Sequence, residues 1–432
     1  MRLTNRGFAV QVVKQLIEAG FTAYWAGGCV RDQLLGRQPK DYDVATNATP
    51  EQVRSLFGYR RTLPIGASFG VITVLGPKPV NPIEVATFRS DGQYSDGRHP
   101  DAVSFCGAQE DAQRRDFTIN GLFFDPLQQR VIDFVGGQDD LRDGVIRAIG
   151  DPAARFHEDK LRMLRAVRFA ATFQFRLDEA TALAIQRDAE NLNQVSAERV
   201  AAEMRRMMVH RNRSLALQLL LETNLLAPVF GRKIADLQNS AGQTAWNQAL
   251  EACSRLDAES FPTAMACLFV LWLGNLSSPE PARDAKVISQ HLASRWKLAN
   301  AERDEMEWLM STWPTIRTAR QAPWPVVQRI LIRPEINHLL AMCTALSGSM
   351  PELTAQIQWC EEKLRLPVEQ LDPEPLVTGD DLLAAGIPAG PHYRMILQEI
   401  RDAQLEGRVQ EKTAGILLAL AWYRDAGVAR GD

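Results

Sequence analysis

The sequence has few of the residues that mark zinc-binding, secreted or membrane proteins. Its 432 residues include 6 cysteines, and no two of them have the Cys-x-x-Cys spacing of a zinc ribbon. This argues against a disulfide framework and predicts reduced thiols. The first residues lack an apolar signal core, and the best candidate for a membrane span, residues 264–274, is too short. The sequence therefore predicts a cytoplasmic protein without a membrane segment.

An excess of positive charge is also missing. The chain has 49 Lys and Arg against 52 Asp and Glu, whereas a strongly basic pI is the usual electrostatic sign of nucleic-acid binding. Any RNA contact must therefore come from a local basic surface, and arginines do cluster at Arg162, Arg165 and Arg168. The histidines form no His-Asp dipeptide, so nothing indicates an attached metal phosphohydrolase domain. No protein partner is indicated either.

The pattern of apolar residues divides the chain into a mixed first part and a helical remainder. Over the first 150 residues, helical periodicity alternates with β-rich runs, and from residue 151 onward the pattern is helical almost throughout. Thr49 begins a capping box with Pro50 at the first helical position. Residues 90–101 are polar and glycine-bearing, which predicts a mobile loop. The expected strands are 22–26, 70–75, 83–87, 117–124 and 131–134, and the expected early helices are 8–19 and 29–35.

A glycine-rich turn and a pair of carboxylates carry the clearest chemical signal. Residues 26–32 read Ala-Gly-Gly-Cys-Val-Arg-Asp, and Asp41 and Asp43 follow at strand spacing, which puts both carboxylates on one face of a strand. Such a pair repels unless a cation lies between its members, and Mg²⁺ is the usual one beside phosphate oxygens. A Gly-Gly turn allows backbone N–H groups to approach a phosphate closely. Taken singly, each feature is more often a tight turn or a solvated strand edge; together they predict metal-assisted nucleotidyl transfer.

The order of these motifs resembles a known family. Gly27-Gly28-x-Val30-Arg31-Asp32 followed by Asp41-x-Asp43 is similar to the nucleotidyltransferase head of the bacterial tRNA nucleotidyltransferase (CCA-adding enzyme) and poly(A) polymerase family, class II. The resemblance implies that Asp41 and Asp43 bind the catalytic Mg²⁺, and that Gly28 and Arg31 belong to the nucleotide site.

A second motif supports the same resemblance. Residues 114–120 read Arg-Arg-Asp-Phe-Thr-Ile-Asn, which on composition alone is a surface ion cluster. The run is a signature of the family, and the resemblance implies that Arg115 binds the triphosphate and that Asp116 and Asn120 lie near the ribose or phosphates. Arginine suits this role because its planar fork binds phosphate bidentately.

A third motif bears on the choice of base. Residues 158–162 read Glu-Asp-Lys-Leu-Arg, so Asp159 and Arg162 are i and i+3 on a predicted helix, where the plain expectation is an exposed ion pair. Because Asp accepts and Arg donates hydrogen bonds, a fixed pair would accept cytosine and adenine and reject guanine and uracil. The segment resembles the Glu-Asp-x-x-Arg motif of the family, which implies selection of CTP and ATP. Arg165 and Arg168 would then face phosphates or the RNA end.

The resemblance implies template-independent addition of CCA to the 3′ end of tRNA from CTP and ATP by two-metal nucleotidyl transfer. Ala67 and Ser68 stand where bacterial poly(A) polymerases tend to have a basic pair, and residues 379–407 are similar to the tail by which CCA-adding enzymes hold the tRNA elbow. Poly(A) addition, or addition of CC or A alone, stays open as an alternative. A non-catalytic RNA-binding protein built on the same head is a remote one.

The fold expected from these observations is α+β, with an N-terminal mixed-sheet head followed by all-α domains. The head, which is catalytic, covers residues 1–150. The expected helical parts are a neck that selects the base (151–225), a body (226–370) and a tail that docks tRNA (371–432).

Overall fold

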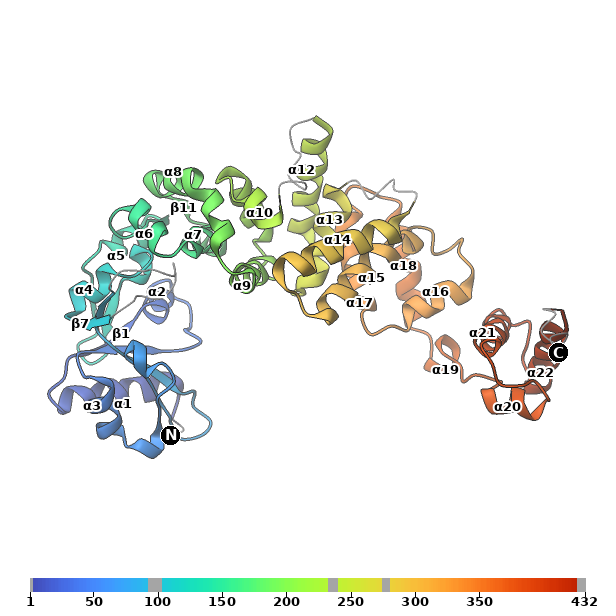
Figure 1. Ribbon diagram of the computed structural model, residues 1–432, viewed down its shortest axis with the longest axis horizontal. Helices are drawn as coiled ribbons and strands as arrows, with labels where there is room; N and C mark the ends of the chain where they lie inside the picture. Colours follow the sequence, from blue (N-terminus) through green and yellow to red (C-terminus); the bar gives the residue numbers. More distant parts are fainter. Residues whose placement is uncertain (1–2, 92–102, 232–239, 274–279, 426–432) are drawn as a thin grey trace. The chain divides into compact units, whose positions relative to one another are not determined.

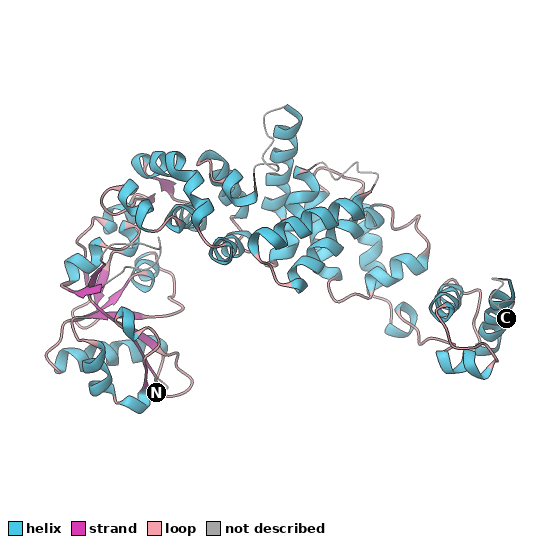
Figure 2. Ribbon diagram, in the orientation of Figure 1, coloured by secondary structure: helices cyan, strands magenta, loops and turns pink. Residues whose placement is uncertain are grey.

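The computed structural model describes residues 3–91, 103–231, 240–273 and 280–425, and it forms two compact units (Figure 1). The first comprises residues 1–238 with 295–297, and the second comprises 239–294 with 298–432. All the strands lie in the first unit, as Figure 2 shows. Most of the loop expected at 90–101 lies outside the described residues. Among the helices of the described part, none combines the length and the apolar character that crossing a membrane requires.

The core of the first unit is a mixed seven-stranded sheet, as the sequence predicts. The strand order is β3-β4-β5-β2-β1-β8-β9, in which β2 and β5 run parallel and the other neighbours run antiparallel. Four expected strands are confirmed, to within two residues at each end. The strands are β1 (Ala23–Ala26), β2 (Asp43–Thr46), β3 (Thr62–Leu63), β4 (Val71–Val74), β5 (Ile83–Thr87), β8 (Phe123–Asp125) and β9 (Arg130–Ile132).

Two helices cover one face of this sheet. Helix α1 (Asn5–Glu18) packs on β1 and β2, and α3 (Pro50–Phe57) packs on β4 and β5. The predicted capping box of Thr49 is confirmed, because its side chain accepts from Gln52 N–H while the Gln52 side chain accepts from Thr49 N–H. Along β4 and β5 the side chains alternate between buried and solvent-accessible positions, so the other face of this half of the sheet is open.

The prediction of a strand over residues 117–124 is wrong for most of these residues. Thr118–Asn120 forms a 3-10 turn (η3), and β8 begins only at Phe123. Local polar bonds favour the turn: the Thr118 hydroxyl donates to the Asp140 carboxylate at 2.7 Å, and the Asn120 amide donates to Asp116 at 3.0 Å. The turn brings Asn120 back toward Asp116. Helices α2 (Gly28–Leu34) and α5 (Gly137–Arg142) contact this turn. Helix α4 (Ala108–Gln113) packs on the two-stranded ribbon of β6 (Arg89–Asp91) and β7 (Val103–Phe105).

The rest of the first unit is helical apart from β11 (Arg176–Leu177), which pairs in parallel with β10 (Val145–Ile146). The prediction that a single helix carries both Asp159 and Arg162 is wrong. Helix α6 ends at Glu158, and the backbone of Asp159 is extended, with φ −142° and ψ 104°. The helices are α6 (Pro152–Glu158), α7 (Leu161–Phe173), α8 (Glu179–Asp188), α9 (Ala197–Met208), α10 (Arg213–Glu222) and α11 (Leu226–Phe230).

The second unit is formed by helices around α13 (Phe261–Trp272), which is buried on every side. It packs against α12 (Ser240–Arg255), α15 (Asn300–Arg317) and α17 (Ile336–Leu346). Because α13 is apolar all round, it serves as the centre of this bundle rather than as a surface helix. The remaining helices are α14 (Pro281–Trp296), α16 (Trp324–Leu331), α18 (Leu353–Leu364), α19 (Val368–Leu371), α20 (Gly379–Ala384), α21 (His392–Leu405) and α22 (Lys412–Asp425).

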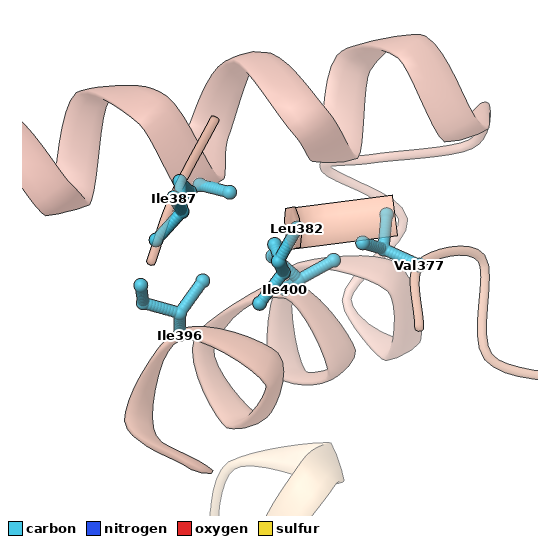
Figure 3. Close-up of a cluster of buried hydrophobic side chains, with 6 residues drawn as sticks. Val377, Leu382, Ile387, Ile396 and Ile400 are labelled. Carbon is cyan, nitrogen blue, oxygen red and sulfur yellow. The ribbon is translucent and has the colours of Figure 1, made fainter. Parts of the chain in front are cut away.

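The last three helices share a small core of their own, shown in Figure 3. Its apolar side chains come from α20, α21 and α22 and from the loops beside α20, and none of the six buried ones is more than 4% exposed. The cluster consists of Val377, Leu382, Ile387, Ile396, Ile400 and Ala419.

We expect Ile400→Val to destabilise this C-terminal core by about 0.5–1.5 kcal/mol, because one buried methylene is lost and a small cavity remains. Amide hydrogen exchange of α20–α22 should accelerate accordingly, while α13 keeps its protection. Leu417→Ala, on an exposed position of α22, is the matched control and should leave exchange unchanged. Equal acceleration by both variants would mean that the cluster does not hold these helices together.

Candidate active site

A cavity of about 480 Å³ lies between the sheet of the first unit and helix α7, within the size range of small-molecule sites. Five arginines and three carboxylates line it, so its charge suits a polyanion. Nine of the predicted site residues meet here, while Asp41 and Arg168 are not in the lining. The lining residues are Gly27, Gly28, Arg31, Asp43, Arg114, Arg115, Asp116, Asn120, Asp159, Arg162, Arg165 and Phe169.

The predicted glycine turn follows β1 directly. Gly27 has φ +69°, and a Cβ atom there would lie 3.0 Å from Nη1 of Arg115, so a side chain at this position meets both backbone strain and a close neighbour. Gly28 is the first residue of α2. The turn therefore presents backbone atoms at the cavity wall, with no side chain covering them.

Arg31 reaches the cavity from α2 and is held on several sides. Its guanidinium donates to Asp32 at 2.7 and 2.9 Å and to Asn120 Oδ1 at 2.6 Å. It also lies over the rings of Phe173, at 4.6 Å, and Phe169, at 5.3 Å. These contacts fix the guanidinium plane, which prepares it for an oxyanion ligand.

A residue that sequence reasoning missed, Asp111 on α4, anchors the arginine pair. Its buried carboxylate accepts from Arg114 at 2.7 Å and from Arg115 at 2.9 Å. Burial opposes the charged form, but the guanidinium groups of Arg115 and Arg114 outweigh it and lower the pKa of Asp111. The i+3 and i+4 spacing from Asp111 to the two arginines was visible in the sequence and is the signal that could have found it.

Asp116 links the sheet to α7. Its carboxylate accepts four hydrogen bonds: from Phe117 N–H and the Asn120 amide on one oxygen, and from Nε and Nη2 of Arg165 on the other. Burial would raise the pKa of Asp116, but the Arg165 charge and these hydrogen bonds lower it. A substrate hydroxyl near Asp116 therefore meets a carboxylate that is already fixed in orientation.

Asp43, which lines the cavity, has two further carboxylates beside it, those of Glu84 and Asp41. Asp43 on β2 is in register with Glu84 on β5, and Asp41 lies just before β2, where it accepts from the Asn81 amide at 3.3 Å. Asp43 keeps access to solvent, yet desolvation by surrounding protein raises its pKa to about 6, with Glu84 and Asp41 adding to the rise and Arg115 opposing it. Glu84 was not predicted, because register across 41 residues cannot be read from the sequence.

The surroundings of Asp43 disfavour its negative charge, and a divalent cation would stabilise that charge. Among the described residues no group of three or more His, Cys, Asp or Glu side chains is already arranged as a metal site. The oxygen donors of Asp41, Asp43 and Glu84 are nevertheless the type that Mg²⁺ prefers, and a bound cation would offset the burial and the like charges that raise the pKa of Asp43.

Asp159 and Arg162 lie on the neck side of the cavity but do not pair with each other. The Asp159 carboxylate accepts from Arg199 Nη2 at 2.7 Å and from Leu161 N–H at 3.1 Å. Arg162 donates to Glu158 at 2.5 Å and to the Arg155 carbonyl at 3.1 Å. Their side chains are only 15% and 10% exposed, so the alternative of an exposed helical ion pair is wrong.

Helix α9 supports this side of the cavity. Besides Arg199 it presents Glu203, a buried carboxylate that accepts from Arg168 at 2.5 Å and from Arg206 at 2.9 Å. Arg168, which lies over the Phe169 ring at 4.0 Å, is thus directed toward α9 rather than into the cavity. Neither Arg199 nor Glu203 was singled out from the sequence for a direct role in the site.

Comparison with known families identifies two segments. Residues 23–147 match the model described as the poly A polymerase head domain, and residues 174–236 match the probable RNA and SrmB-binding site of polymerase A. The first segment contains the glycine turn, the carboxylates and the arginine pair.

Curated relatives extend the similarity over most of the chain. The CCA-adding enzyme of Lactobacillus johnsonii is 33% identical over 413 residues, which cover 94% of this chain and 95% of the relative. Poly(A) polymerase I of Salmonella typhi is 43% identical over 234 residues, or 51% of this chain and 49% of the relative. The likeness to the polymerase is thus confined to about half of each chain.

Solved structures agree with this fold. The Bacillus stearothermophilus CCA-adding enzyme in complex with CTP has a TM-score of 0.74 and 27% identity, with 98% of each chain covered. The Thermotoga maritima CCA-adding enzyme in complex with tRNA has a TM-score of 0.65 at 19% identity, covering 96% of this chain and 94% of that one, and it supports the fold alone. The expectation of an α+β fold with a mixed-sheet head and helical remainder is confirmed.

Proposed function

The chain belongs to the family of CCA-adding enzymes and bacterial poly(A) polymerases, and from this premise we propose the reaction that its cavity performs. The protein is a nucleotidyltransferase that adds CCA to the 3′ end of tRNA from CTP and ATP without a nucleic-acid template. The observation that carries this function is the meeting of Asp159 and Arg162 with Asp43 and the arginines around one cavity. Base-reading groups and phosphate-binding groups there lie within the span of one nucleotide.

Poly(A) addition is the second candidate, because about half of the chain is 43% identical to a poly(A) polymerase. The match to CCA-adding enzymes over 94% of the chain favours CCA addition, since it includes the helical second unit as well. We propose that both reactions would use the same cavity and differ in how the RNA is held.

We propose that Asp41 and Asp43, with Glu84 beside them, hold Mg²⁺. When bound, the metal would stabilise the negative charge that develops during phosphoryl transfer and favour ionisation of the attacking hydroxyl. Asp41 accepts from Asn81 through Oδ1 alone, so its other oxygen could bind a metal while this hydrogen bond is kept.

The chain's own groups supply binding and orientation. We propose that Arg31, Arg115 and Arg165 bind the triphosphate, since their guanidinium planes are already fixed by Asn120, Asp111 and Asp116. The backbone of Gly28 bounds the same region. Asp116 and Asn120 would then lie near the ribose. Holding the reactants in one geometry in this way lowers the entropic part of the barrier.

The four-part division of the chain is likewise a proposal: a catalytic head (1–150), a base-selecting neck (151–225), a body (226–370) and a tRNA-docking tail (371–432). In the tail, Arg401 is engaged by Asp372 and the Pro373 carbonyl. Arg394 is exposed and has no hydrogen-bond or ion-pair partner among the described residues, so it is the better candidate for an RNA phosphate. We also propose a cytoplasmic location, where tRNA ends are made and the six free thiols stay reduced.

The test is incubation of the purified protein with tRNA lacking its 3′ CCA. Each nucleoside triphosphate is supplied alone and then CTP with ATP, with and without Mg²⁺, and the product ends are sequenced. We expect CC from CTP alone and CCA from the mixture, with no product in chelator. A long A tract from ATP alone would identify a poly(A) polymerase, and binding without incorporation would identify a non-catalytic RNA-binding protein.

A further inference from the structure

The catalytic Asp43 is the first member of a row that crosses half of the sheet. Asp43 on β2 is in register with Glu84 on β5, Glu84 with Thr73 on β4, and Thr73 with Leu63 on β3. Residues in register on neighbouring strands point to the same face. With about 4.8 Å between strands, the row extends roughly 14 Å from Asp43 to the edge of the sheet.

This row lies on an open surface. On β4 and β5, which α3 covers, the residues that alternate with Thr73 and Glu84 are buried, whereas Thr73 and Glu84 themselves reach solvent. Leu63 is 39% exposed, and Ile65 in the following turn is 71% exposed. The turn lies beside the same face, because a Cβ atom at Gly66 would be 3.4 Å from Cβ of Val71, two residues before Thr73. Two large apolar side chains thus lie on the same open face as the carboxylate of Asp43, at the other end of the row.

The position of the nucleotide cavity indicates which part of the substrate contacts this surface. The arginines that would hold the leaving pyrophosphate all lie on the β1, β8 and α7 side of Asp43. In phosphoryl transfer the attacking and leaving oxygens are roughly in line across the phosphorus atom. The attacking 3′-hydroxyl must therefore approach Asp43 from the opposite side, where β5, β4 and β3 present the open row.

We propose that the surface formed by Leu63, Ile65 and Thr73 binds the 3′-terminal nucleotide of the acceptor RNA. This inference rests on the proposed nucleotidyl transfer and adds to it the location of the growing end. Leu63 and Ile65 offer apolar contact to a base or ribose face, and the Thr73 hydroxyl can hydrogen-bond to a ribose hydroxyl or a phosphate. Arg60 and Arg61, both exposed just before β3, provide positive charge for the preceding phosphates.

The first experiment separates RNA binding from nucleotide binding. The full-length variants Leu63→Ser and Ile65→Ser are assayed with tRNA lacking CCA, with tRNA and CTP varied in turn. We expect KM for tRNA to rise about tenfold, as loss of one buried apolar side chain implies, with KM for CTP within about twofold of the parent. Leu127→Ser, an exposed leucine at the β8–β9 turn, is the control and should change neither constant.

The second experiment locates the RNA end directly. A tRNA lacking CCA and carrying 4-thiouridine as its 3′-terminal nucleotide is irradiated with the wild-type protein, and the attached peptide is mapped. Attachment within residues 61–75 supports the proposal, and attachment confined to residues 155–168 overturns it. An unchanged KM for tRNA in both variants also overturns the proposal, even if the variants self-associate less than the parent protein does. A wild-type protein that extends no RNA would instead refute the proposed function.

Discussion

Asp43→Asn should reduce nucleotide incorporation by about 10³-fold or more. The amide keeps the shape of the side chain but removes one carboxylate charge from the group that would hold Mg²⁺. Loss of such a ligand costs several kcal/mol of transition-state stabilisation, and each 1.4 kcal/mol is about tenfold in rate. The measurement is the single-turnover rate of CMP addition to tRNA lacking CCA at saturating Mg²⁺.

The same substitution should not weaken the fold. The pKa of Asp43 is raised to about 6, above the ordinary value, by desolvation and by Glu84 and Asp41. The native state therefore binds a proton more tightly than the unfolded chain does, so the ionised carboxylate destabilises the native state above that pKa. Replacing it with a neutral amide removes this repulsion, and the Tm measured in chelator at neutral pH should stay level or rise.

Opposite effects on rate and stability distinguish a catalytic carboxylate from a structural one. Asp143→Asn, on an exposed aspartate of the same unit, is the matched control and should leave the rate unchanged. If Asp43→Asn kept more than a tenth of the parent rate, the metal assignment would be wrong. If it lost activity together with several degrees of Tm, Asp43 would be holding the sheet together instead.

The residues that the sequence identified are those carried by short, contiguous motifs. The glycine turn, the Asp-x-Asp pair and the Arg-Arg-Asp run are read over a few positions, and the structure brings most of them to one cavity. Their partners were not found, because Arg199 meets Asp159 across 40 residues and Glu84 meets Asp43 across 41. Such pairing depends on helix packing and strand register, which local periodicity does not determine.

Local backbone geometry accounts for the errors. Apolar residues at 117, 119 and 122–124 suggested a strand, but Thr118 and Asn120 form side-chain hydrogen bonds that favour a turn. Asp159 was expected within a helix, but α6 ends one residue earlier and its carboxylate accepts from Leu161 N–H at the start of α7. Aspartate at such a junction is a recognised helix-start signal, so this break was in principle visible.

The break between α6 and α7 has a consequence for base selection. Because Asp159 leaves the helical path, its carboxylate is free of Arg162 and is held by Arg199 from α9. Arg162 is held separately by Glu158 and the Arg155 carbonyl. An acceptor and a donor that are fixed independently at the cavity wall can both face a base edge.

Asp159→Ala should therefore relax discrimination against UTP and GTP as well as slow CTP and ATP. In the proposed role, the carboxylate would accept from the amino group of cytosine or adenine, whereas uracil and guanine would place a carbonyl there. Each unpaired group costs about 1–3 kcal/mol, so removal of Asp159 should reduce the preference for CTP over UTP by roughly 5- to 150-fold. The measurement is kcat/KM for each of the four nucleotides on tRNA lacking CCA.

Arg199→Ala is a second, independent test of base selection by Asp159. It leaves the carboxylate in place but removes the donor that orients it, so selectivity should shift in the same direction by a smaller factor. Asp188→Ala, on a neck aspartate whose partner Arg187 is exposed, is the control and should preserve the preference. If Asp159→Ala slowed all four nucleotides equally, selection would lie elsewhere, and the Asp159–Arg199 pair would serve only to join α9 to the junction between α6 and α7.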